Sequence, residues 1–595
     1  MSSVKENEKE LQIHKVRHSL SHLLATAVLE KYPKTLLGIG PVIENGFYYD
    51  FDFSAPISES DLPGFEKRVR ELVKENLSFT KKSVTYIQAK KLFAKNKYKL
   101  ELIEELKKKK SPISVYETTR GTGKKKEVIF TDLCSGPHIK NTKEILPDAF
   151  AFTHLAGAYW RGDEKNKMLT RIYGLAFETK KELDVYREML KEAERRDHKK
   201  LGVELDLFTF SDLVGSGLPL WTPKGTLLRI LLDDFVWQLR SARGYEKVEI
   251  PHITKKELYE KSGHWQKFSE ELFRITTREG HFFAMKPMNC PHHTQIYARK
   301  KWSYRELPQR YANTTMCYRD EQSGELSGLS RVRSFAQDDA HVFCRMSQAK
   351  DEFLKIWDII HEFYGVFGFN LRIRVSTHDP KHPEKYLGDK KKWAHAESIL
   401  RDIVKEKHAD TYEGIGEAAF YGPKLDFMAK DSLGREWQVA TIQLDMNMPE
   451  RFDLSCVNEK GEPERIVMIH AAIMGSIERF LSVLIEHYAG AFPVWLSPVQ
   501  VTILPISEKF LSYARTVEEQ LKKSGIRVSL AEANETLGKR IRETELQKIP
   551  YILVVGEKEE TSKTVNIRMR GKKETETKTL VEFTKELEKK IEEKK

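Results

Sequence analysis

Apolar residues recur every three to four positions near the start of the chain, which is the spacing of one helix face. The stripe consists of Leu20, Leu23, Leu24, Ala27 and Val28. It predicts a helix from Leu11 to Lys31. A charged stretch from Phe177 to Leu201 carries a thinner apolar stripe, and it predicts a helix that connects two domains.

Over residues 204–253 the pattern of apolar residues changes from that of a strand to that of a helix and back to that of a strand. ELDLFTF (204–210) predicts a short strand, and TLLRILLDDFVWQLRSARG (226–244) predicts a helix that ends at Gly244, because glycine favours the left-handed conformation of a C-cap. YEKVEIPHI (245–253) then predicts a strand with Pro251 at its end.

The last hundred residues alternate β-rich and amphipathic runs. Strands are predicted within 498–507, 526–533, 551–560 and 564–571, and helices within 507–525 and 536–549. This alternation predicts a small α/β domain with a mixed sheet.

Residues 315–341, TMCYRDEQSGELSGLSRVRSFAQDDAH, have the pattern of two antiparallel strands around a polar turn that contains glycine. Arg319 and Arg331 can then point into one cleft, and Phe335 offers a flat face for a purine. A guanidinium matches phosphate oxygens with a rigid fork of donors and keeps its charge. The hairpin therefore suits a nucleoside triphosphate; the alternative is a surface hairpin with salt bridges.

Histidines and a cysteine recur at four-residue spacing in the N-terminal block. His14, His18 and His22 share one face of the predicted helix. Cys134 and His138 are also four apart, in a Gly-Pro turn. If the two groups meet in space, they suffice for a tetrahedral metal site or a catalytic site; the alternative is a structural role.

The composition indicates a multidomain protein with reduced cysteines and no membrane-spanning segment. The chain has 595 residues, too many for one core, so three or four domains are expected. The net charge of +12 fits a polyanionic partner. Five scattered cysteines without a C-x-x-C pair suggest reduced thiols and a cytoplasmic location. The N-terminus lacks a signal-peptide core, and no run of roughly 20 apolar residues could span a membrane.

Three features resemble the signature motifs of class II aminoacyl-tRNA synthetases. They are Pro251 after a helix and strand, the hairpin with Arg319 and Phe335, and Arg479 in AAIMGSIERF before an apolar helical run. The resemblance implies an antiparallel-sheet catalytic core that binds ATP and a homodimer built through the first motif. From the residues alone, helix 226–244 is better interpreted as an ordinary core helix, and only the resemblance favours the dimer.

KPMNC (286–290), QDDAH (337–341) and MIHAAIMGS (468–476) resemble threonyl-tRNA synthetases. The resemblance implies that Cys290, His341 and His470 bind one Zn²⁺ in the amino-acid pocket. Such a site keeps a position open for substrate, so that threonine can chelate through its amino nitrogen and hydroxyl while valine cannot. Serine keeps the hydroxyl and lacks only a methyl group, which a pocket rejects by roughly 10–200-fold, so an editing site is required.

The same resemblance implies roles for the rest of the pocket. Arg319 contacts the α-phosphate, Arg479 the γ-phosphate, and Phe335 lies under the adenine, with Mg²⁺ between the phosphates. Arg319, Arg479 and Lys424 are the predicted catalytic residues. The remaining predicted residues are Glu321 and Arg331 for ATP, and Met288, Gln337, Asp339, Tyr421 and Gln443 for threonine.

HSLSH (18–22), CSGPH (134–138) and residues 153–177 resemble the editing domain of bacterial threonyl-tRNA synthetases. The resemblance implies that seryl-tRNA(Thr) is hydrolysed there, with a metal-free site using His138 and a positioned water preferred over zinc. Basic stretches at 107–112 and 121–128 are expected to be loops, either solvated or in contact with the tRNA backbone. The chain begins at the editing helix, with no room for the ubiquitin-like domain of many relatives. The implied editing residues are His18, His22, Asp132, Cys134 and His138.

Two positions depart from the family pattern. Ala471 stands where a basic residue usually follows the histidine, which removes one positive charge near the reacting groups. His292 stands where glycine is usual, next to His293, and an extra imidazole there could compete for the ion.

The C-terminal order resembles the anticodon-binding domain of class II synthetases. Asn534 and Arg568 correspond to readers of anticodon bases, and Lys539, Arg540 and Arg542 suit phosphates. Without that context they are ordinary surface residues.

The sequence therefore predicts a multidomain α+β protein: an editing domain (1–176), a linker helix (177–201), a class II catalytic domain (202–493) and an anticodon-binding domain (494–595). The predicted activity uses ATP, L-threonine and tRNA(Thr) in a cytoplasmic homodimer. Two alternatives remain. One is a class II synthetase for another amino acid, such as serine or proline, although proline has no hydroxyl for zinc. The other is a silent tRNA-binding paralogue, which the intact Arg319, Glu321 and Arg479 oppose.

Overall fold

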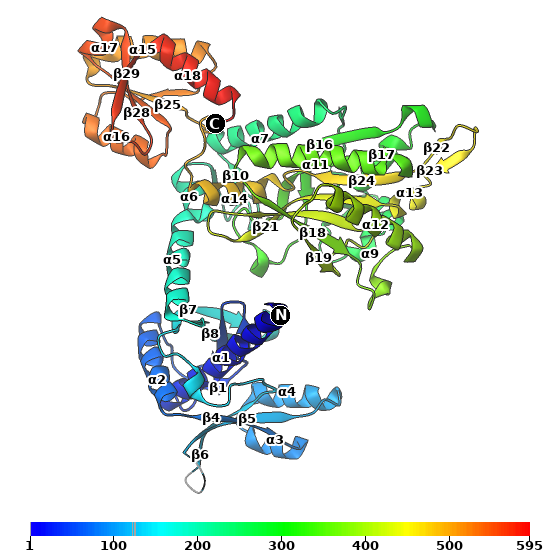
Figure 1. Cartoon of the computed structure of the whole chain (residues 1–595), viewed down its shortest axis with the longest axis vertical. Coiled ribbons are helices and arrows are strands. Elements are labelled where there is room, and N and C mark those ends of the chain that lie inside the picture. Colours follow the sequence, from blue (N-terminus) through cyan, green and yellow to red (C-terminus); the bar gives the residue numbers. More distant parts are fainter. Residues whose placement is uncertain (1, 122, 124–125, 389) are drawn as a thin grey trace. The chain divides into compact units, whose positions relative to one another are not determined.

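The computed structural model describes residues 2–121, 123, 126–388 and 390–595 (Figure 1). It divides into two compact units, Met1–Lys191 and Glu192–Lys595. Lys124 and Lys125 of the predicted basic loop lie outside the described residues. Within the described ranges, no helix combines the length and the apolar character that a bilayer crossing needs.

The first unit is built on a long helix and two sheets. Its helices are α1 (Ser2–Lys31), α2 (Leu62–Lys74), α3 (Tyr86–Leu92), α4 (Lys97–Lys108) and the start of α5 (Lys180–Arg196). Its strands are β1 (Leu36–Leu37), β2 (Val42–Ile43), β3 (Gly46–Asp52), β4 (Ser78–Ser83), β5 (Ser114–Arg120), β6 (Glu127–Leu133), β7 (Phe150–Tyr159) and β8 (Met168–Ala176). One sheet has the order β1-β3-β8-β7, with β2 on β3, and the other has the order β4-β5-β6.

The predicted stripe of α1 is the buried face of that helix. Leu20, Leu23, Leu24 and Val28 are fully buried, and they share a core with Phe47 and other residues of β3 and α2. The helix begins at Ser2, nine residues before the predicted start. The residues between are polar helix formers without an apolar stripe, so the pattern carried no signal for them.

The larger part of the second unit surrounds an eight-stranded sheet. Its helices are α6 (His198–Glu204), α7 (Pro223–Ser241), α8 (Lys256–Ser262), α9 (His264–Lys267), α10 (Cys290–Tyr297), α11 (Ala349–Val366), α12 (Lys390–Glu406), α13 (Asn447–Arg451) and α14 (Ile477–Tyr488). The sheet consists of β11 (Glu246–Lys247), β16 (Gln309–Tyr318), β17 (Ser334–Cys344), β24 (Val467–Ala472), β21 (Glu436–Asp445), β20 (Lys424–Lys430), β18 (Leu371–Thr377) and β19 (Thr411–Ile415), in that order.

Smaller strands complete this part of the chain. They are β9 (Phe208–Thr209), β10 (Leu220–Trp221), β12 (Ile253–Lys255), β13 (Arg274–Thr276), β14 (Phe282–Met285), β15 (Trp302–Ser303), β22 (Ser455–Val457) and β23 (Pro463–Arg465).

The two faces of the large sheet differ in character. Side chains alternate along β24, so Ile469 and Ala471 join an apolar core while His470 between them lines a cavity. The same core contains residues of α7, α11 and α14. All the pairs between β16 and β18 in the sheet order are antiparallel, whereas the pairs β11–β16 and β18–β19 are parallel. The hairpin predicted for residues 315–341 is confirmed as β16 and β17.

Three predicted elements differ from the structure. The single helix predicted over 177–201 is interrupted at Asp197, whose side chain caps α6 by accepting from the N–H of Lys199. Within the strand predicted over 245–253, only β11 and the first residue of β12 form strands, and Pro251 lies between them. The strand predicted over 204–210 is only β9. The helix over 226–244 ends at Ser241, and Gly244 has φ +76°, the left-handed conformation expected there.

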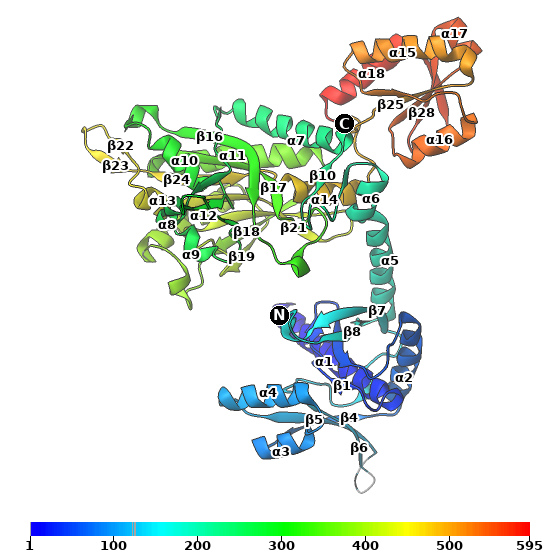
Figure 2. The ribbon, with the colours of Figure 1, turned by 180° about the vertical axis from the view of Figure 1, so that it is seen from behind.

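The C-terminal part is a mixed sheet, as predicted, but it has five strands where four were predicted, and the strand predicted over 551–560 gives way to a helix at Glu557–Ser562. Its strands are β25 (Val501–Pro505), β26 (Val528–Leu530), β27 (Tyr551–Val555), β28 (Thr564–Met569) and β29 (Thr575–Thr579), and its helices are α15 (Leu511–Lys523), α16 (Leu537–Leu546), α17 (Glu557–Ser562) and α18 (Leu580–Glu592). The order is β26-β25-β27-β28-β29, parallel at β26–β25–β27 and antiparallel beyond. Helices α15 and α18 cover one face, and α16 lies on the other (Figure 1, Figure 2).

Candidate functional site

One cavity of about 680 Å³ lies on the large sheet. It gathers every residue that the sequence assigned to ATP, threonine or zinc, from segments nearly 200 residues apart. These are Met288, Cys290, Arg319, Glu321, Arg331, Phe335, Gln337, Asp339, His341, Tyr421, Lys424, Gln443, His470 and Arg479.

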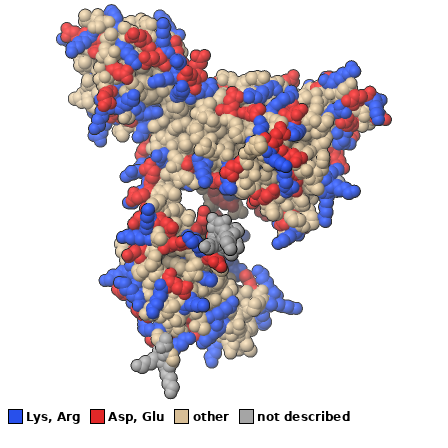
Figure 3. Space-filling model, viewed as in Figure 1, with Lys and Arg blue, Asp and Glu red and all other residues tan. Residues whose placement is uncertain are grey.

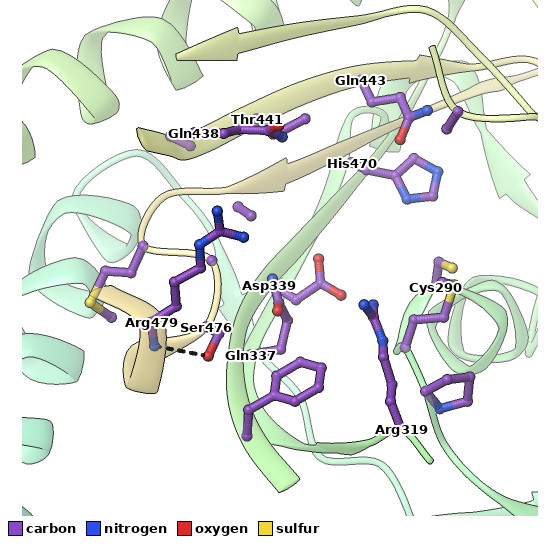
Figure 4. A pocket seen from close by; sticks show the side chains of 18 of the residues that line it. Cys290, Arg319, Gln337, Asp339, Gln438, Thr441, Gln443, His470, Ser476 and Arg479 are labelled. Atoms are coloured by element: carbon purple, nitrogen blue, oxygen red, sulfur yellow. Dashed lines mark hydrogen bonds between the residues drawn. The ribbon is translucent and has the colours of Figure 1, made fainter. Parts of the chain in front are cut away.

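Two histidines face each other across neighbouring strands in this cavity. His341 of β17 and His470 of β24 are direct cross-strand partners, and His341 Nε2 lies 3.1 Å from His470 Nδ1. Cys290 begins α10, and its sulfur and one nitrogen of each histidine lie within 4.8 Å of one another. Figure 4 labels Cys290 and His470 of this cluster. The spacing of the three donors suits one metal ion.

The other nitrogens of the two histidines are held by neighbours that the sequence did not single out. His470 Nε2 lies 3.0 Å from Asp445 Oδ2, and His341 Nδ1 lies 2.7 Å from His293 Nδ1. Asp445 is held in turn by the backbone N–H groups of Asn447 and Met448. His341 Nε2 and His470 Nδ1 are therefore the atoms directed at the donor cluster, an arrangement typical of metal-binding histidines.

The electrostatics of the three donors also fit a cation. Burial, reinforced by Asp339 and Asp445, raises the pKa of the Cys290 thiol well above its usual range. Burial lowers the pKa of His341, so its imidazole is neutral. One cysteine and two histidines form a donor set typical of catalytic zinc, which requires the thiolate form of the cysteine.

Two arginines reach into the cavity from opposite sides (Figure 4). The Arg319 guanidinium lies 5.2 Å from the Phe335 ring centre, and its buried Nε has no hydrogen-bond partner among the described residues. Arg479 lies in the first turn of α14, where its N–H donates to Ser476 Oγ at 3.3 Å. Burial and the nearby Arg331 lower the pKa of Arg479, yet a guanidinium stays charged at neutral pH. Both cations are available to phosphate groups.

Carboxylates hold the third arginine at the cavity edge. Arg331 lies 2.8 Å from Glu321 and 2.7 Å from Glu325. Glu321 is buried, whereas Arg331 is 48 % exposed. The pair belongs to the loop between β16 and β17, so the position of this loop decides where Arg331 points.

A buried carboxylate organises the floor beside Lys424. Asp426 Oδ2 accepts from Lys424 at 2.8 Å and Ser376 at 2.7 Å, and Oδ1 accepts from Gln438 and Thr441. This group was missed because Asp426 lies within an apolar strand pattern, LDFMA. Gln443 donates to the carbonyl of Gly422 at 2.9 Å, and the Tyr421 ring lies 5.1 Å from that of His470.

The departure at Ala471 leaves a cation nearby. Arg240 of α7 donates to the Ala471 carbonyl at 3.1 Å and forms an ion pair with Asp338. A buried positive charge therefore remains next to β24, on a different element. At the other departure, both ring nitrogens of His292 are buried and have no hydrogen-bond partner among the described residues, while His293 contacts His341.

A second cluster lies within the first unit, where α1 meets the loop after β6. Cys134 Sγ lies 3.3 Å from His18 Nε2 and 3.3 Å from His138 Nε2, and the donor atoms of His22 join them within 4.8 Å. Gly136 makes this turn, because its φ of +78° suits glycine and a Cβ there would collide with Tyr116. The structure therefore brings the H-x-x-x-H and C-x-x-x-H pairs together, as their spacing predicted.

Neighbours that the sequence did not reveal hold Asp132 beside this cluster. Asp132 lies 2.6 Å from buried Lys99 and accepts from Tyr49, and His22 Nε2 lies 3.8 Å away. Ser19 Oγ lies 3.1 Å from His138 Nδ1. Lys99 comes from α4, outside both motifs, so no local pattern connected it with them.

Burial is the largest cause of the pKa shifts in this cluster. It lowers the pKa values of His18, His22 and His138 and raises that of Cys134 to about 11. The three imidazoles and the thiol are therefore neutral at pH 7 unless a metal ion binds. Neutral imidazole is the form that accepts a proton.

The predicted anticodon residues lie in the C-terminal part of the chain. Asn534 precedes α16, and Arg568 of β28 lies 3.1 Å from Glu545. The phosphate role predicted for Arg540 is wrong, because its side chain is buried and donates to the carbonyls of Glu535 and Pro505. Its position on a basic helix did not reveal that it faces inward.

Three family models match separate parts of the chain. Residues 273–488 match the class II core domain of tRNA synthetases (G, H, P, S and T), and residues 500–590 match an anticodon-binding domain. Residues 113–173 match the second additional domain of threonyl- and alanyl-tRNA synthetases. The large sheet and its cavity are thus those of a class II aminoacyl-tRNA synthetase.

Curated relatives cover nearly the whole chain. A threonine–tRNA ligase of Porphyromonas gingivalis is 48 % identical over 585 residues, which is 97 % of this chain and 88 % of that protein. One from Flavobacterium johnsoniae is 48 % identical over 558 residues, 93 % of this chain and 84 % of that protein. The chain belongs to the threonine–tRNA ligase family. These matches do not favour either alternative, a synthetase for another amino acid or a silent paralogue.

Solved structures agree with this assignment. The crystal structure of the RNA-binding domain of threonyl-tRNA synthetase from Cryptosporidium parvum is 38 % identical with a TM-score of 0.63, and it covers 66 % of this chain and 98 % of that chain. A putative threonyl-tRNA synthetase from Aeropyrum pernix is 29 % identical with a TM-score of 0.60, covering 67 % of this chain and 97 % of that chain.

Proposed function

We propose that this chain is a threonine–tRNA ligase that activates L-threonine with ATP, transfers it to tRNA(Thr) and hydrolyses mischarged seryl-tRNA(Thr). The observation that carries the proposal is the convergence of Cys290, His341 and His470 in one cavity with Arg319 and Arg479. Amino-acid selection by a cation and triphosphate binding thus share one space.

The donor cluster fits a resident zinc ion. Cys290, His341 and His470 would hold it, with Asp445 and His293 orienting the two imidazoles. Bound zinc would supply a Lewis acid with an open position for the amino nitrogen and hydroxyl of threonine. Asp339 lies 3.7 Å from His341 and is positioned to accept from the substrate ammonium or hydroxyl, while Tyr421 closes the pocket beside His470.

The nucleotide half of the cavity serves the first step. The threonine carboxylate attacks the α-phosphorus of ATP, the bond to the bridging oxygen breaks, and pyrophosphate leaves with the electron pair. Arg319 stabilises charge at the α-phosphate, Arg479 holds the γ-phosphate, and Phe335 offers its face to adenine. Mg²⁺ accompanies the triphosphate. In the second step a ribose hydroxyl of the tRNA terminus attacks the threonyl carbonyl, and AMP leaves.

Serine correction is assigned to the cluster in the first unit. The neutral His138 imidazole, stacked against Phe79 and next to His18, is suited to orient a water for attack on the seryl ester. We prefer this metal-free mechanism, although the donors of His18, His22, Cys134 and His138 also suit zinc.

Two further proposals concern partners and location. Apolar side chains on α7 and β10 are exposed, with Ile230 at 50 % and Leu220 at 41 %, which suits burial against a second copy in a homodimer.

Asn534 and Arg568 are proposed to contact anticodon bases. Basic and acidic side chains are interspersed on the visible face (Figure 3), so the net charge of +12 does not identify a tRNA surface. A cytoplasmic location remains a prediction.

ATP–pyrophosphate exchange with each amino acid tests the proposal. We expect rapid exchange with threonine, weaker exchange with serine, and none above background with valine or proline. Arg319→Ala should abolish exchange. Fastest exchange with another amino acid, or no exchange with any, would overturn the proposed activity.

A further inference from the structure

His198, the first residue of α6, lies beneath the loop that joins β16 and β17. Its side chain is buried, and neither the mechanism nor the sequence motifs involve it. The backbone N–H of Leu329 donates to His198 Nε2 at 3.0 Å. Because Nε2 accepts this bond, the ring proton of neutral His198 is on Nδ1, which lies 2.6 Å from Glu486 Oε1. Both nitrogens are thus used in hydrogen bonds.

Charged neighbours hold Glu486 in place. Burial alone would raise the pKa of Glu486, but hydrogen bonds from His198 and Arg435 outweigh it, and the carboxylate is ionised. Arg435 also pairs with Asp431. Asp197, His198 and Glu486 have metal-compatible spacing, but the commitment of both imidazole nitrogens leaves His198 no free donor. The cluster is a support for the loop.

The supported residue is the centre of a tight turn. Ser327 and Arg331 exchange backbone hydrogen bonds of 3.1 and 3.3 Å, and Leu329 lies between them, fully buried. Ser330 Oγ contacts Ser482 Oγ of α14 at 2.9 Å. The residue after Ser330 is Arg331, which lines the cavity and pairs with Glu321. Holding the Leu329 N–H therefore restricts where Arg331 can point.

Gly328 shows how closely the imidazole approaches this turn. A Cβ added there would lie 2.3 Å from His198 Nε2, and φ at Gly328 is +51°. A side chain at this position would push the loop and the ring apart. In the same loop, a Cβ added at Gly324 would meet nothing within 4 Å.

We propose that His198 is a positioning residue for the ATP site: by accepting from the Leu329 N–H, it directs Arg331 and Glu321 toward the nucleotide. The inference rests on the proposed function, because it assigns the loop to ATP. If so, α6, which begins at His198, supports the nucleotide site.

Two substitutions at His198 separate the hydrogen bond from simple packing. In His198→Asn the shorter amide can still donate to Glu486 but cannot reach Leu329. In His198→Gln the side-chain oxygen lies near the position of Nε2 and can still accept. The loss of one neutral hydrogen bond predicts an increase of about three- to tenfold in the KM for ATP in His198→Asn. We expect little change in kcat or in the KM for threonine, and a KM for ATP close to the parent value in His198→Gln.

Gly328→Ala tests the same contact from the loop side, with Gly324→Ala as its matched control. Gly328→Ala should raise the KM for ATP as His198→Asn does, and Gly324→Ala should leave it unchanged. Parent-like KM values in both His198→Asn and Gly328→Ala would overturn the inference. Equal defects in His198→Asn and His198→Gln would also overturn it, because packing alone would then explain the role. Absence of exchange activity in the parent would instead refute the proposed function.

Discussion

Arg240 Nη1 lies 2.5 Å from Asp338 Oδ1, in an ion pair buried between α7 and β17. Asp338 Oδ2 also accepts the backbone N–H groups of Ile473 and Met474, both at 2.9 Å. These two residues lead from β24 into α14, which carries Arg479. One buried carboxylate thus connects the α7 helix with the turn that precedes Arg479, an arginine that lines the cavity.

Arg240→Met should strongly destabilise the catalytic part, because it leaves the Asp338 carboxylate buried without its counter-ion. Breaking one side of such a pair costs roughly 3–5 kcal/mol. The control is Arg243→Met at the end of the same helix, whose partner Glu362 is 53 % exposed, and the expected loss there is below about 1 kcal/mol. Denaturant unfolding followed by tryptophan fluorescence measures both. Similar midpoint shifts in the two variants would contradict the assigned importance of the pair.

Zinc content should be about one ion per chain, and Cys290→Ser should remove most of it, because the thiolate is the softest of the three donors. Asp445→Asn should keep the three donors but weaken zinc affinity by about 10–100-fold. The amide oxygen stays with the backbone N–H groups of Asn447 and Met448, and the amide nitrogen that then faces His470 Nε2 cannot accept its proton. Elemental analysis and chelator competition are the measurements. Cys456→Ala, a buried cysteine outside the cavity, is the control. Full zinc retention in Cys290→Ser would show that the ligand set is wrong.

His138→Ala and His18→Ala should leave threonylation unchanged while seryl-tRNA(Thr) accumulates. Both rings contact Cys134 in the first unit, and neither lines the cavity on the large sheet. His154→Ala, an exposed histidine of the same unit, is the matched control and should remain accurate. Misacylation is measured with labelled serine. Parent-like accuracy in both pocket variants would mean that serine is removed elsewhere or not at all.

Hydrolysis of seryl-tRNA(Thr) should hold its rate from pH 8 down to about 6, where an ordinary imidazole is already about three-quarters protonated. Burial lowers the pKa values of His18 and His138, so the proton-accepting forms persist to lower pH than usual. Deacylation of pre-formed seryl-tRNA across this range measures the effect. A decline centred near pH 6.5 would show that the histidine responsible is solvated like a surface residue.

Local patterns of apolar and polar residues were enough to predict the helices and strands whose buried residues recur periodically. The stripe of α1, the hairpin of β16 and β17, and the elements β25 to β28, α15 and α16 follow from apolar spacing and turn residues. The pattern did not predict α17 or β29. The pattern failed where the chain is held by tertiary contacts. The break at Asp197 is one case, and the stretch around Pro251, where only Glu246–Lys247 forms a strand, is another.

In the candidate sites, too, local sequence patterns did not reveal residues that act through contacts between distant segments. Cys290, His341 and His470 lie far apart in the sequence, so only the family resemblance joined them, and strand pairing explains how the two histidines meet. Their support Asp445 and the buried Lys99 beside Asp132 had no sequence signal, because each acts through a contact between distant segments. The sequence placed His293 near the site only as the neighbour of His292 and did not predict its contact with His341. Arg540 shows the opposite error, since a basic helix pattern does not tell which guanidinium faces inward.

The direct pairing of His341 with His470 makes the proposed metal site sensitive to the length of β24. Removing one residue from β24 before His470 would advance the pairing by one position and turn every side chain of the strand to the opposite face. An imidazole would then enter the aliphatic interior, and Ala471 would replace it at the mouth of the pocket. Natural variation here should therefore change residue types more readily than it inserts or deletes residues within β24.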